Sequence, residues 1–398
     1  MNILVVSSYL PFPLLNGGNI RLYNILKELS KNHSISLICE KRSKQTMEDV
    51  KEVEKFCKKV ITVERKKQWS LKNILKAGLS RESFLKVGHN LPEMREIISA
   101  EMKSNNYDVI HVETFYILQN VPEVTVPVVL IEHNIEYLVY ERFKNTVPFL
   151  MKPFLKLDIL KIKREEEQSW MRADFIGTVS HEEKDIIGGN NVEVVANGVD
   201  TQTFSLKKLK KESKGPYKIL YIGDYSWVQN RDAVKYIIQD IWPHLKNEID
   251  VKLWIVGRNM PDSLKELGKN DDRIYFDDNN TSPTHEIFSE ADVLLAPKRV
   301  GGGTSYKVLE AMAVGTPVIA NTLGVEGFKV HNREDVLIAD TSEDLAKMVV
   351  DVLNDKSLAE KVSINGRKTV EKYYTWSSIT ADLEQLYKKA LQKSKYTV

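Results

Sequence analysis

Short apolar runs alternate with segments of helical periodicity along most of the chain. Residues 3–6 form the first run, four consecutive apolar positions that predict a strand buried on both faces. Leu22, Ile25 and Leu29 then recur at the spacing of a helix that buries one face. The alternation predicts further strands at residues 35–39, 60–63, 109–112, 128–131, 175–179 and 192–196. Helical patterns fill the gaps, and the longest covers about residues 137–172.

The second half of the chain repeats this alternation. Strands are predicted at residues 218–222, 252–256, 274–276, 293–296, 317–320 and 336–339, and helices at 233–242, 305–313 and 344–353. Repeated strand–helix units are typical of parallel sheets covered on both faces. The predicted fold class is therefore α/β, with two Rossmann-like, doubly wound domains facing across a cleft. Ligands of such domains bind at the carboxyl ends of the strands.

A Lys-rich stretch, residues 206–216, separates the two halves and ends in Gly215-Pro216. Clustered charge followed by Gly-Pro is typical of a linker between domains. The alternative is a solvated surface loop within one domain. We favour the linker, because the strand–helix alternation starts again directly after it.

The overall composition excludes several classes of protein. Lys and Arg number 57 against 55 Asp and Glu, a net charge of +2, whereas nucleic-acid binders are usually much more basic. We therefore expect no nucleic-acid partner. No apolar run is long enough to span a bilayer, and the first residues lack the pattern of a signal peptide. Cys39 and Cys57 both lie in apolar patterns, so we expect reduced core thiols and a cytoplasmic location.

The strongest candidate site follows the strand predicted at residues 293–296. Three consecutive glycines precede a predicted helix, which Gly315 would close as a left-handed cap. The backbone N–H groups of Gly303, Thr304 and Ser305 would lie at the start of this helix, where its dipole favours an anion. Lys307, in the first turn, would add a full positive charge. Backbone, dipole and ammonium group together predict a diphosphate site.

Glu310 lies seven residues after Gly303 on the same helix. Its carboxylate could accept hydrogen bonds from the two hydroxyls of a ribose. The alternative is that Glu310 and Lys307 are only a surface pair three residues apart. The residues of this helix do not by themselves decide between these two interpretations.

A weaker candidate is the loop after the first predicted strand, which ends in Gly17 and Gly18. Glycines allow a ligand close to the backbone, and the following helix start favours an anion, so a phosphate or a sugar would fit. A tight turn that simply needs glycine explains the same residues.

Residues 301–320 resemble the donor-binding segment of the retaining glycosyltransferases of family 4, whose GT-B fold has two Rossmann-like halves. Six other landmarks agree with this family in the same order along the chain. They are Gly17-Gly18, the strand that ends in His133, Asn197-Gly-Val-Asp200, Tyr221-Ile-Gly223, Trp254-Ile-Val-Gly257 and Tyr374-Thr-Trp376. The resemblance covers essentially the whole chain, and its specificity comes from the order of the landmarks.

The resemblance implies a division into domains. Residues 1–205 would form an acceptor-side domain, residues 206–216 the linker, and residues 217–376 the domain that binds the nucleotide sugar. The last helix, about residues 377–398, would cross back onto the first domain.

The resemblance also implies a reaction. A sugar would move from a nucleoside diphosphate sugar to a hydroxyl of a sugar or lipid-linked acceptor, with retention of configuration, in cell-surface polysaccharide or glycolipid assembly. The nucleotide sugar is a substrate, and we expect no cofactor and no metal. His133 would contact the transferred sugar, Gly223 would lie at the donor, and either Arg231 or Lys307 would bind the diphosphate.

One position departs from the family pattern. The family usually has two glutamates eight positions apart; Glu310 is the second, but position 302 is Gly302, as in a Gly-Gly-Gly-Thr subgroup. The missing glutamate normally touches the donor sugar. This departure leaves open that the chain is an inactive transferase-like binding subunit. A sugar-nucleotide epimerase with the same fold and a two-domain binding protein are further alternatives.

Three stretches of the first half are basic and apolar together, at residues 65–72, 151–156 and 161–164. Such segments can rest on an anionic membrane surface, where lipid-linked acceptors lie. Peripheral contact with the inner face of the membrane is therefore one interpretation of these stretches. Solvated helix faces with ordinary core contacts are the alternative.

Overall fold

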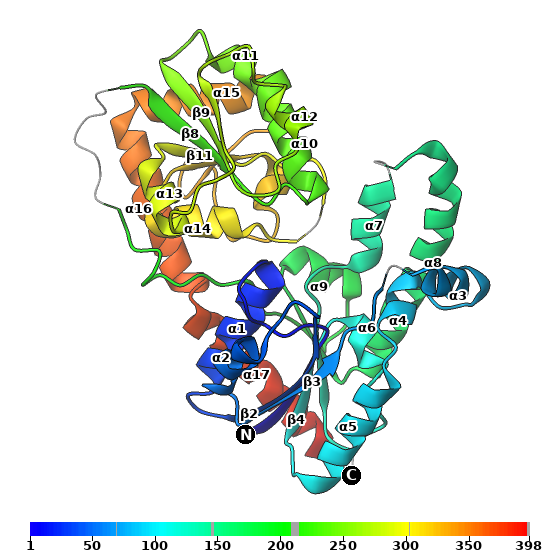
Figure 1. Ribbon diagram of the computed structural model, residues 1–398. Helices are drawn as coiled ribbons and strands as arrows, with labels where there is room; N and C mark the ends of the chain where they lie inside the picture. The colour runs from blue at the N-terminus through cyan, green and yellow to red at the C-terminus, as the bar shows by residue number, and fades with distance from the viewer. Residues whose placement is uncertain (69, 145–146, 208–214, 302, 396–398) are drawn as a thin grey trace. The chain divides into compact units, whose positions relative to one another are not determined.

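The computed structural model describes residues 1–68, 70–144, 147–207, 215–301 and 303–395. The chain divides into two compact units (Figure 1). Unit 1 comprises Met1–Ala196 and Trp376–Val398, and unit 2 comprises Asn197–Thr375. The boundary therefore lies at residue 196, whereas the sequence predicted residue 205. Most of the predicted linker, residues 208–214, lies outside the described residues.

Unit 1 is built on a seven-stranded sheet with the order β3-β2-β1-β4-β5-β6-β7. All its neighbouring strands are parallel. The strands are β1 (Asn2–Ser7), β2 (Ser34–Lys41), β3 (Lys59–Glu64), β4 (Val109–Glu113), β5 (Val128–Ile131), β6 (Phe175–Thr178) and β7 (Val192–Val194). Each coincides with a strand predicted from an apolar run, because runs of this kind form strands buried on both faces.

Helices cover both faces of this sheet. They are α1 (Gly17–Leu29), α2 (Met47–Glu54), α3 (Leu71–Leu79), α4 (Phe84–Gly88), α5 (Pro92–Ser104), α6 (Phe115–Leu118), α7 (Glu136–Lys144), the 3₁₀ turn η1 (Phe149–Met151), α8 (Lys152–Arg172), α9 (His181–Ile187) and α17 (Trp376–Lys395). Figure 1 shows α1 and α17 on one face and α5 on the other.

The uninterrupted helical pattern predicted for residues 137–172 is wrong. Helix α7 ends at Lys144 and α8 begins at Lys152, with Pro148 just before η1. Proline has no N–H to donate and forces the residue before it away from helical angles, so the helix is divided although the apolar spacing continues.

Unit 2 is built on a six-stranded parallel sheet with the order β10-β9-β8-β11-β12-β13. The strands are β8 (Tyr217–Ile222), β9 (Val251–Val256), β10 (Ile274–Asp277), β11 (Val293–Leu295), β12 (Val318–Ala320) and β13 (Leu337–Ile338). The two parallel sheets confirm the predicted α/β class with two Rossmann-like domains.

The helical elements of unit 2 are α10 (Val228–Tyr236), the π-helical η2 (Ile237–Ile241), α11 (Trp242–Leu245), α12 (Asp262–Lys265), α13 (Thr284–Glu290), α14 (Tyr306–Val314), the 3₁₀ turn η3 (Thr322–Val325), α15 (Ser342–Asn354) and α16 (Lys356–Tyr373). The single helix predicted at residues 233–242 is therefore three consecutive segments. Helix α14 ends at Gly315, whose φ of 80° and ψ of 26° confirm the predicted left-handed cap.

Both sheets reverse their strand order beside a central strand. The reversal lies between β1 and β4 in unit 1 and between β8 and β11 in unit 2. Successive helices leave such a point toward opposite faces, so the carboxyl ends of these strands line a crevice. The chemistry-bearing residues of each unit are therefore expected at the ends of these four strands.

Candidate active site

A chain of polar side chains lies at the carboxyl end of β4 in unit 1. Glu113, the last residue of β4, holds His111 Nε2 2.7 Å from its Oε1 and hydrogen-bonds His133 Nε2 through its Oε2. His111 Nδ1 lies 2.5 Å from the hydroxyl of Tyr387, which helix α17 contributes. A carboxylate can only accept, so both histidine Nε2 atoms donate to Glu113. Tyr387, His111, Glu113 and His133 thus form one continuous network.

The network holds a charged carboxylate in a buried place. Glu113 and His111 are fully buried, whereas the His133 side chain is 16% exposed. Burial by itself would raise the pKa of Glu113, but the charge of His133 and hydrogen bonds from both histidines outweigh it and hold that pKa well below its usual range. Glu113 therefore stays ionised and fixes the orientation of the His133 ring. Among the four residues, His133 is the one that can reach a ligand.

His111 lies within β4, two residues before Glu113. In the structure its imidazole is enclosed and uses both nitrogens within the network. His111 therefore supports Glu113 and cannot contact a substrate directly.

The glycine loop after β1 has a packing role. Asn16 caps α1 by accepting a hydrogen bond from Asn19 N at 3.1 Å. A Cβ on Gly18 would lie 3.2 Å from the Tyr9 hydroxyl oxygen, so a side chain would press on Tyr9. The Tyr9 ring in turn meets the His133 ring edge-on, with centroids 6.3 Å apart. Gly17 begins α1, and the predicted contact of Gly17 and Gly18 with a donor stays a prediction.

Unit 2 holds a pocket of about 130 Å³ at the start of α14. Its lining includes the predicted residues Gly303, Thr304, Ser305 and Lys307. Ser305 caps α14 without a side-chain hydrogen bond to the first turn, so within the described residues the helix start keeps backbone donors for a ligand. The pocket therefore lies where the sequence predicted a diphosphate site, and the binding of an anion there stays a prediction. Gly302 lies outside the described residues.

Lys307 is held over an aromatic ring inside this pocket. Its Nζ lies 4.0 Å from the centroid of the Tyr221 ring and donates to Asn230 Oδ1 at 3.0 Å. Burial lowers the pKa of Lys307 to about 7; the charge of Glu310 opposes this shift and that of Lys298 adds to it. An anion in the pocket would favour the charged ammonium form.

Glu310 shares this environment. Burial raises the pKa of Glu310 to about 8, against the opposing influence of Lys307. Lys307 and Glu310 are both half-buried, so they are more than an exposed surface pair. The interaction of Glu310 with a ribose remains a prediction.

Two polar residues make contacts around the same pocket that the sequence analysis did not predict. Lys298 lines it and donates from Nζ to Gly303 O at 2.8 Å. Asn197 donates to Thr304 Oγ1 at 2.6 Å and accepts from the Tyr306 hydroxyl at 3.1 Å. Lys298 lies three residues after the end of β11, and a basic residue close to a strand end was the available signal. Asn197 is distant in sequence, and only the fold brings it here.

The turn after β8 needs glycine for close packing. Gly257 has a φ of 140°, and a Cβ there would lie 1.8 Å from Gly223 O. A Cβ on Gly223 would lie 2.7 Å from the side chain of Asn230, which bonds Lys307. Glycine at these two positions therefore leaves room for the turns after β8 and β9 to pack against each other and against Asn230.

Arg231 lies on α10 and donates hydrogen bonds to the turn after β8. Its Nη1 donates to Tyr225 O at 2.6 Å and to Ser226 O at 2.8 Å. Arg231 is not among the residues that line the pocket, whereas Lys307 is. Of the two predicted diphosphate ligands, the geometry favours Lys307.

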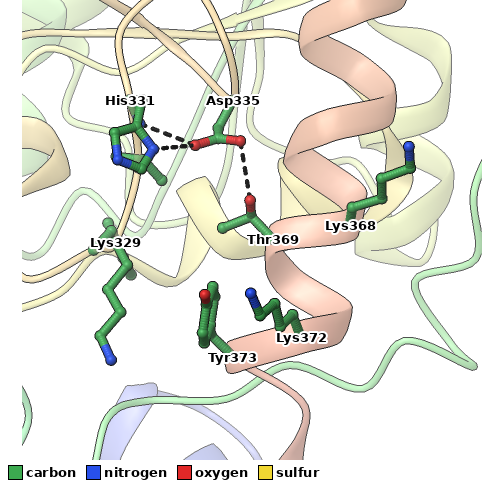
Figure 2. A pocket seen from close by; sticks show the side chains of 9 residues that line it. Lys329, His331, Asp335, Lys368, Thr369, Lys372 and Tyr373 are labelled. Atoms are coloured by element: carbon green, nitrogen blue, oxygen red, sulfur yellow. Dashed lines mark hydrogen bonds and ion pairs between the residues drawn. The ribbon is translucent and has the colours of Figure 1, made fainter.

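A second pocket of unit 2, about 530 Å³ in volume, lies between the loop after η3 and helix α16 (Figure 2). Asp335 is held there by His331 Nδ1 at 3.2 Å and by the Thr369 hydroxyl at 3.0 Å. Lys329 and Lys372 approach the Tyr373 ring, at 5.2 and 4.7 Å from its centroid. These lysines are exposed, and the pocket shares no residue with the one at α14.

No cluster of three or more His, Cys, Asp or Glu side chains suited to a metal ion occurs in the part of the chain that the structure describes. None of the helices in the described ranges is both long and apolar enough to cross a membrane. Cys39 and Cys57 are free and buried, as expected.

Models of two glycosyltransferase families match the chain. The model described as Glycosyltransferase Family 4 matches residues 15–203, and the model described as Glycosyl transferases group 1 matches residues 216–355. The first match lies almost entirely within unit 1 and extends seven residues into unit 2. The second match lies wholly within unit 2.

Individual proteins give a consistent picture. An uncharacterised 44.6 kDa protein of the cps region of Klebsiella pneumoniae is 23% identical over 390 residues, 94% of this chain and 96% of its own. The phosphatidyl-myo-inositol mannosyltransferase of Mycobacterium leprae is 27% identical over 209 residues, 50% of this chain and 54% of its own.

Solved structures share the fold. Sucrose-phosphate synthase from Thermosynechococcus elongatus superposes with a TM-score of 0.72 at 16% identity, over 99% of this chain and 100% of that one. Anabaena HepE in complex with UDP and glucose superposes with a TM-score of 0.66 at 13% identity, over 98% and 100%.

The two parallel sheets and the two family matches define the protein as an enzyme, a glycosyltransferase with the GT-B fold. Within that class, the match over residues 15–203 places it with family 4.

Proposed function

We propose that this glycosyltransferase moves a sugar from a nucleoside diphosphate sugar to a hydroxyl of a sugar or lipid-linked acceptor, with retention of configuration. The observation that carries the proposal is the pocket at the start of α14. There Lys307 lies beside a helix start whose cap residue, Ser305, makes no side-chain hydrogen bond to the first turn. A diphosphate is the part of a nucleotide sugar that such a site fits.

The leaving diphosphate gains negative charge as the glycosidic bond breaks. The backbone N–H groups of the first turn of α14, the helix dipole and Lys307 can stabilise that charge. Lys298, which already orders Gly303, adds a second cation at the pocket. The proposal therefore needs no metal and no cofactor.

His133 supplies the other part of the mechanism. The transferred sugar passes through an oxocarbenium-like state and must be held beside the acceptor hydroxyl. His133 is proposed to contact that sugar, and Glu113 to fix the imidazole in one orientation. Glu310 is proposed to bind the ribose of the donor.

Relatives support a place in cell-surface assembly. One is named a phosphatidyl-myo-inositol mannosyltransferase, and the Staphylococcus aureus protein CapM is named a capsular polysaccharide biosynthesis glycosyltransferase. HepE has been solved with UDP and with UDP-glucose. We extend these activities to this chain as part of the proposal, with the protein working at the cytoplasmic side of the membrane. None of the comparisons favours the epimerase or the non-catalytic subunit.

Thermal-shift measurements on the full chain test the proposal. UDP, GDP, ADP and dTDP, with their common sugar conjugates, are compared; a ligand at ~100 times its Kd adds about 2.7 kcal/mol to the folding free energy. We expect one nucleotide to raise the Tm and Lys307→Met to abolish the shift. Lys329→Met, in the second pocket, is the matched control and should keep it.

The reaction itself is tested with the nucleotide sugar that binds. Turnover with an acceptor should give a product whose anomeric configuration, read by NMR, equals that of the donor. A well-folded protein that binds none of the nucleotides would refute the proposal, and an inverted product would refute the retaining mechanism.

A further inference from the structure

Helix α3 of unit 1 presents its apolar face outward. Leu71, Ile74, Leu75 and Leu79 follow the spacing of one helix stripe, and all four are exposed, Leu71 at 80% and Leu79 at 89%. Ala77 is the only residue of this helix that is buried. An amphipathic helix normally turns its apolar stripe to the core, so this stripe serves something other than the fold.

A second exposed apolar stretch comprises η1 and the first turns of α8. Phe149 and Leu150 of η1 are each 81% exposed, and Phe154 and Leu157 on the first turns of α8 are exposed as well. Lys161 of α8 donates to Ala77 O at 2.6 Å and so joins the two helices. Figure 1 shows α3 beside α8.

The core does not require these side chains. Helix α8 already packs inward through Ile159 and Ile162, which are buried. Of the twenty large apolar side chains that are exposed among the described residues, ten lie within residues 71–79 and 149–160. Exposed apolar surface concentrated in this way marks an interaction site.

The charge of these two segments is almost entirely basic. Residues 71–79 and 149–164 carry seven basic side chains and a single acidic one, Asp158. The basic residues are Lys72, Lys76, Lys152, Lys156, Lys161, Lys163 and Arg164. Asp158 accepts from Phe84 N at 3.0 Å and is thus used inside unit 1. The whole chain has a net charge of only +2, so basic charge is concentrated here.

We propose that α3, η1 and the first half of α8 form a docking surface for an anionic lipid bilayer, with the apolar side chains at the acyl boundary and the lysines among the headgroups. Lysine stems can follow the apolar stripe while their ammonium groups stay in the headgroup layer. Helices that lie in a membrane interface have this combination of an apolar stripe and basic flanks. The inference stands on this surface alone and does not depend on the proposed function.

A second copy of the chain fits this surface less well. A two-fold interface places the same patch of both copies face to face. Seven basic groups on each side would then repel one another, whereas an anionic bilayer attracts all of them.

Sedimentation of the full chain with vesicles tests the docking surface. Vesicles of phosphatidylcholine alone are compared with vesicles that also contain phosphatidylglycerol. We expect binding to the anionic vesicles, weaker binding at high salt, and little binding to the neutral ones. The triple variant Leu71→Ser/Leu75→Ser/Leu79→Ser should lower partitioning into the vesicles at least tenfold. The double variant Lys72→Gln/Lys76→Gln should lower it roughly tenfold or more, because each lysine near the membrane surface contributes about fivefold.

Exposed apolar residues elsewhere provide the control. Tyr275→Ser/Ile364→Ser changes two exposed positions of unit 2 and should bind vesicles like the parent chain. The inference is overturned if the parent chain ignores anionic vesicles, or if the α3 variant binds them equally well. It is also overturned if sedimentation velocity shows a dimer that the α3 variant turns into a monomer. Nucleotide binding is measured in parallel, so failure of the proposed function is recognised separately.

Discussion

His133 Nε2 is hydrogen-bonded to the buried carboxylate of Glu113, so a partly exposed imidazole is anchored to a charge that solvent cannot reach. Glu113 in turn is fixed by His111, and His111 by Tyr387. The carboxylate stays ionised because the histidines hold its pKa well below the ordinary value against the effect of burial. Glu113 is thus a positioning residue for His133.

Glu113→Gln should therefore impair the orientation of His133 more than the fold. A glutamine keeps the shape of the side chain but removes the charge and one acceptor. We expect kcat to fall roughly 10- to 100-fold, as for other partners that orient a functional histidine, with little change in the Kd of the donor. Steady-state kinetics and direct binding separate the two effects.

Glu40→Gln is the matched control for that prediction. Glu40 is also buried and lies 2.6 Å from a histidine, His89 Nδ1. A comparable loss of kcat in both variants would show that the effect of Glu113→Gln is a general loss of packing.

The lowered pKa of Lys307 predicts that the protein takes up a proton when it binds the donor. Its pKa is about 7 in the free protein, so at pH 8 most of the ammonium groups have lost their proton. A bound diphosphate favours the charged form and raises that pKa, so binding at pH 8 takes up close to one proton. The affinity should fall as the pH rises above about 7, at most tenfold per pH unit.

Calorimetry in buffers of different ionisation enthalpy measures this proton. Lys307→Met should remove the uptake, whereas Glu310→Gln should retain it. If the uptake persists in Lys307→Met, another group carries the proton, and the assignment of Lys307 is wrong.

Gly257→Ala should destabilise unit 2. The new Cβ would lie 1.8 Å from Gly223 O, and the φ of 140° is unfavourable for alanine. Overpacking and backbone strain together should cost about 3 kcal/mol or more. Urea unfolding measures the loss. Gly78→Ala, on α3 with nothing within 4 Å of the new atom, should instead add about 0.5–1 kcal/mol.

Arg231→Met distinguishes support of a loop from binding of a phosphate. The guanidinium satisfies the carbonyls of Tyr225 and Ser226, so its removal should cost about 1–3 kcal/mol of stability. The donor affinity should fall less than in Lys307→Met. The neighbouring Arg258→Met, which breaks an exposed pair with Asp224, should cost under about 1 kcal/mol. A greater loss of affinity in Arg231→Met than in Lys307→Met would make Arg231 the diphosphate ligand.

The strands were predictable because a strand buried on both faces needs an uninterrupted apolar run, and such runs are local. The helices were less so. The apolar periodicity continues through Pro148, although the helical backbone cannot continue there. For α3, the periodicity shows an apolar stripe but not that this stripe faces solvent. Which side of a helix meets the core depends on its neighbours.

The candidate site divides in the same way. The pocket at the start of α14 was predictable, because the glycines, the helix start and Lys307 lie within a few residues of one another. The role of Glu113 was not predictable, because it depends on partners that only the fold brings together. His111 and His133 lie 2 and 20 positions from Glu113, and Tyr387 lies 276 positions from His111. The roles of His133, Glu310 and Gly302 stay predictions.

Helix α17 gives unit 1 an unusual order of assembly. Its residues follow all of unit 2 in the chain, yet Leu383, Leu386 and Tyr387 are buried in unit 1. On the ribosome, the first 196 residues emerge long before the helix that completes their core and holds His111 in place. Unit 2 is thus complete in the nascent chain while unit 1 still lacks its last helix, so the histidine network forms only after all of unit 2 has been made.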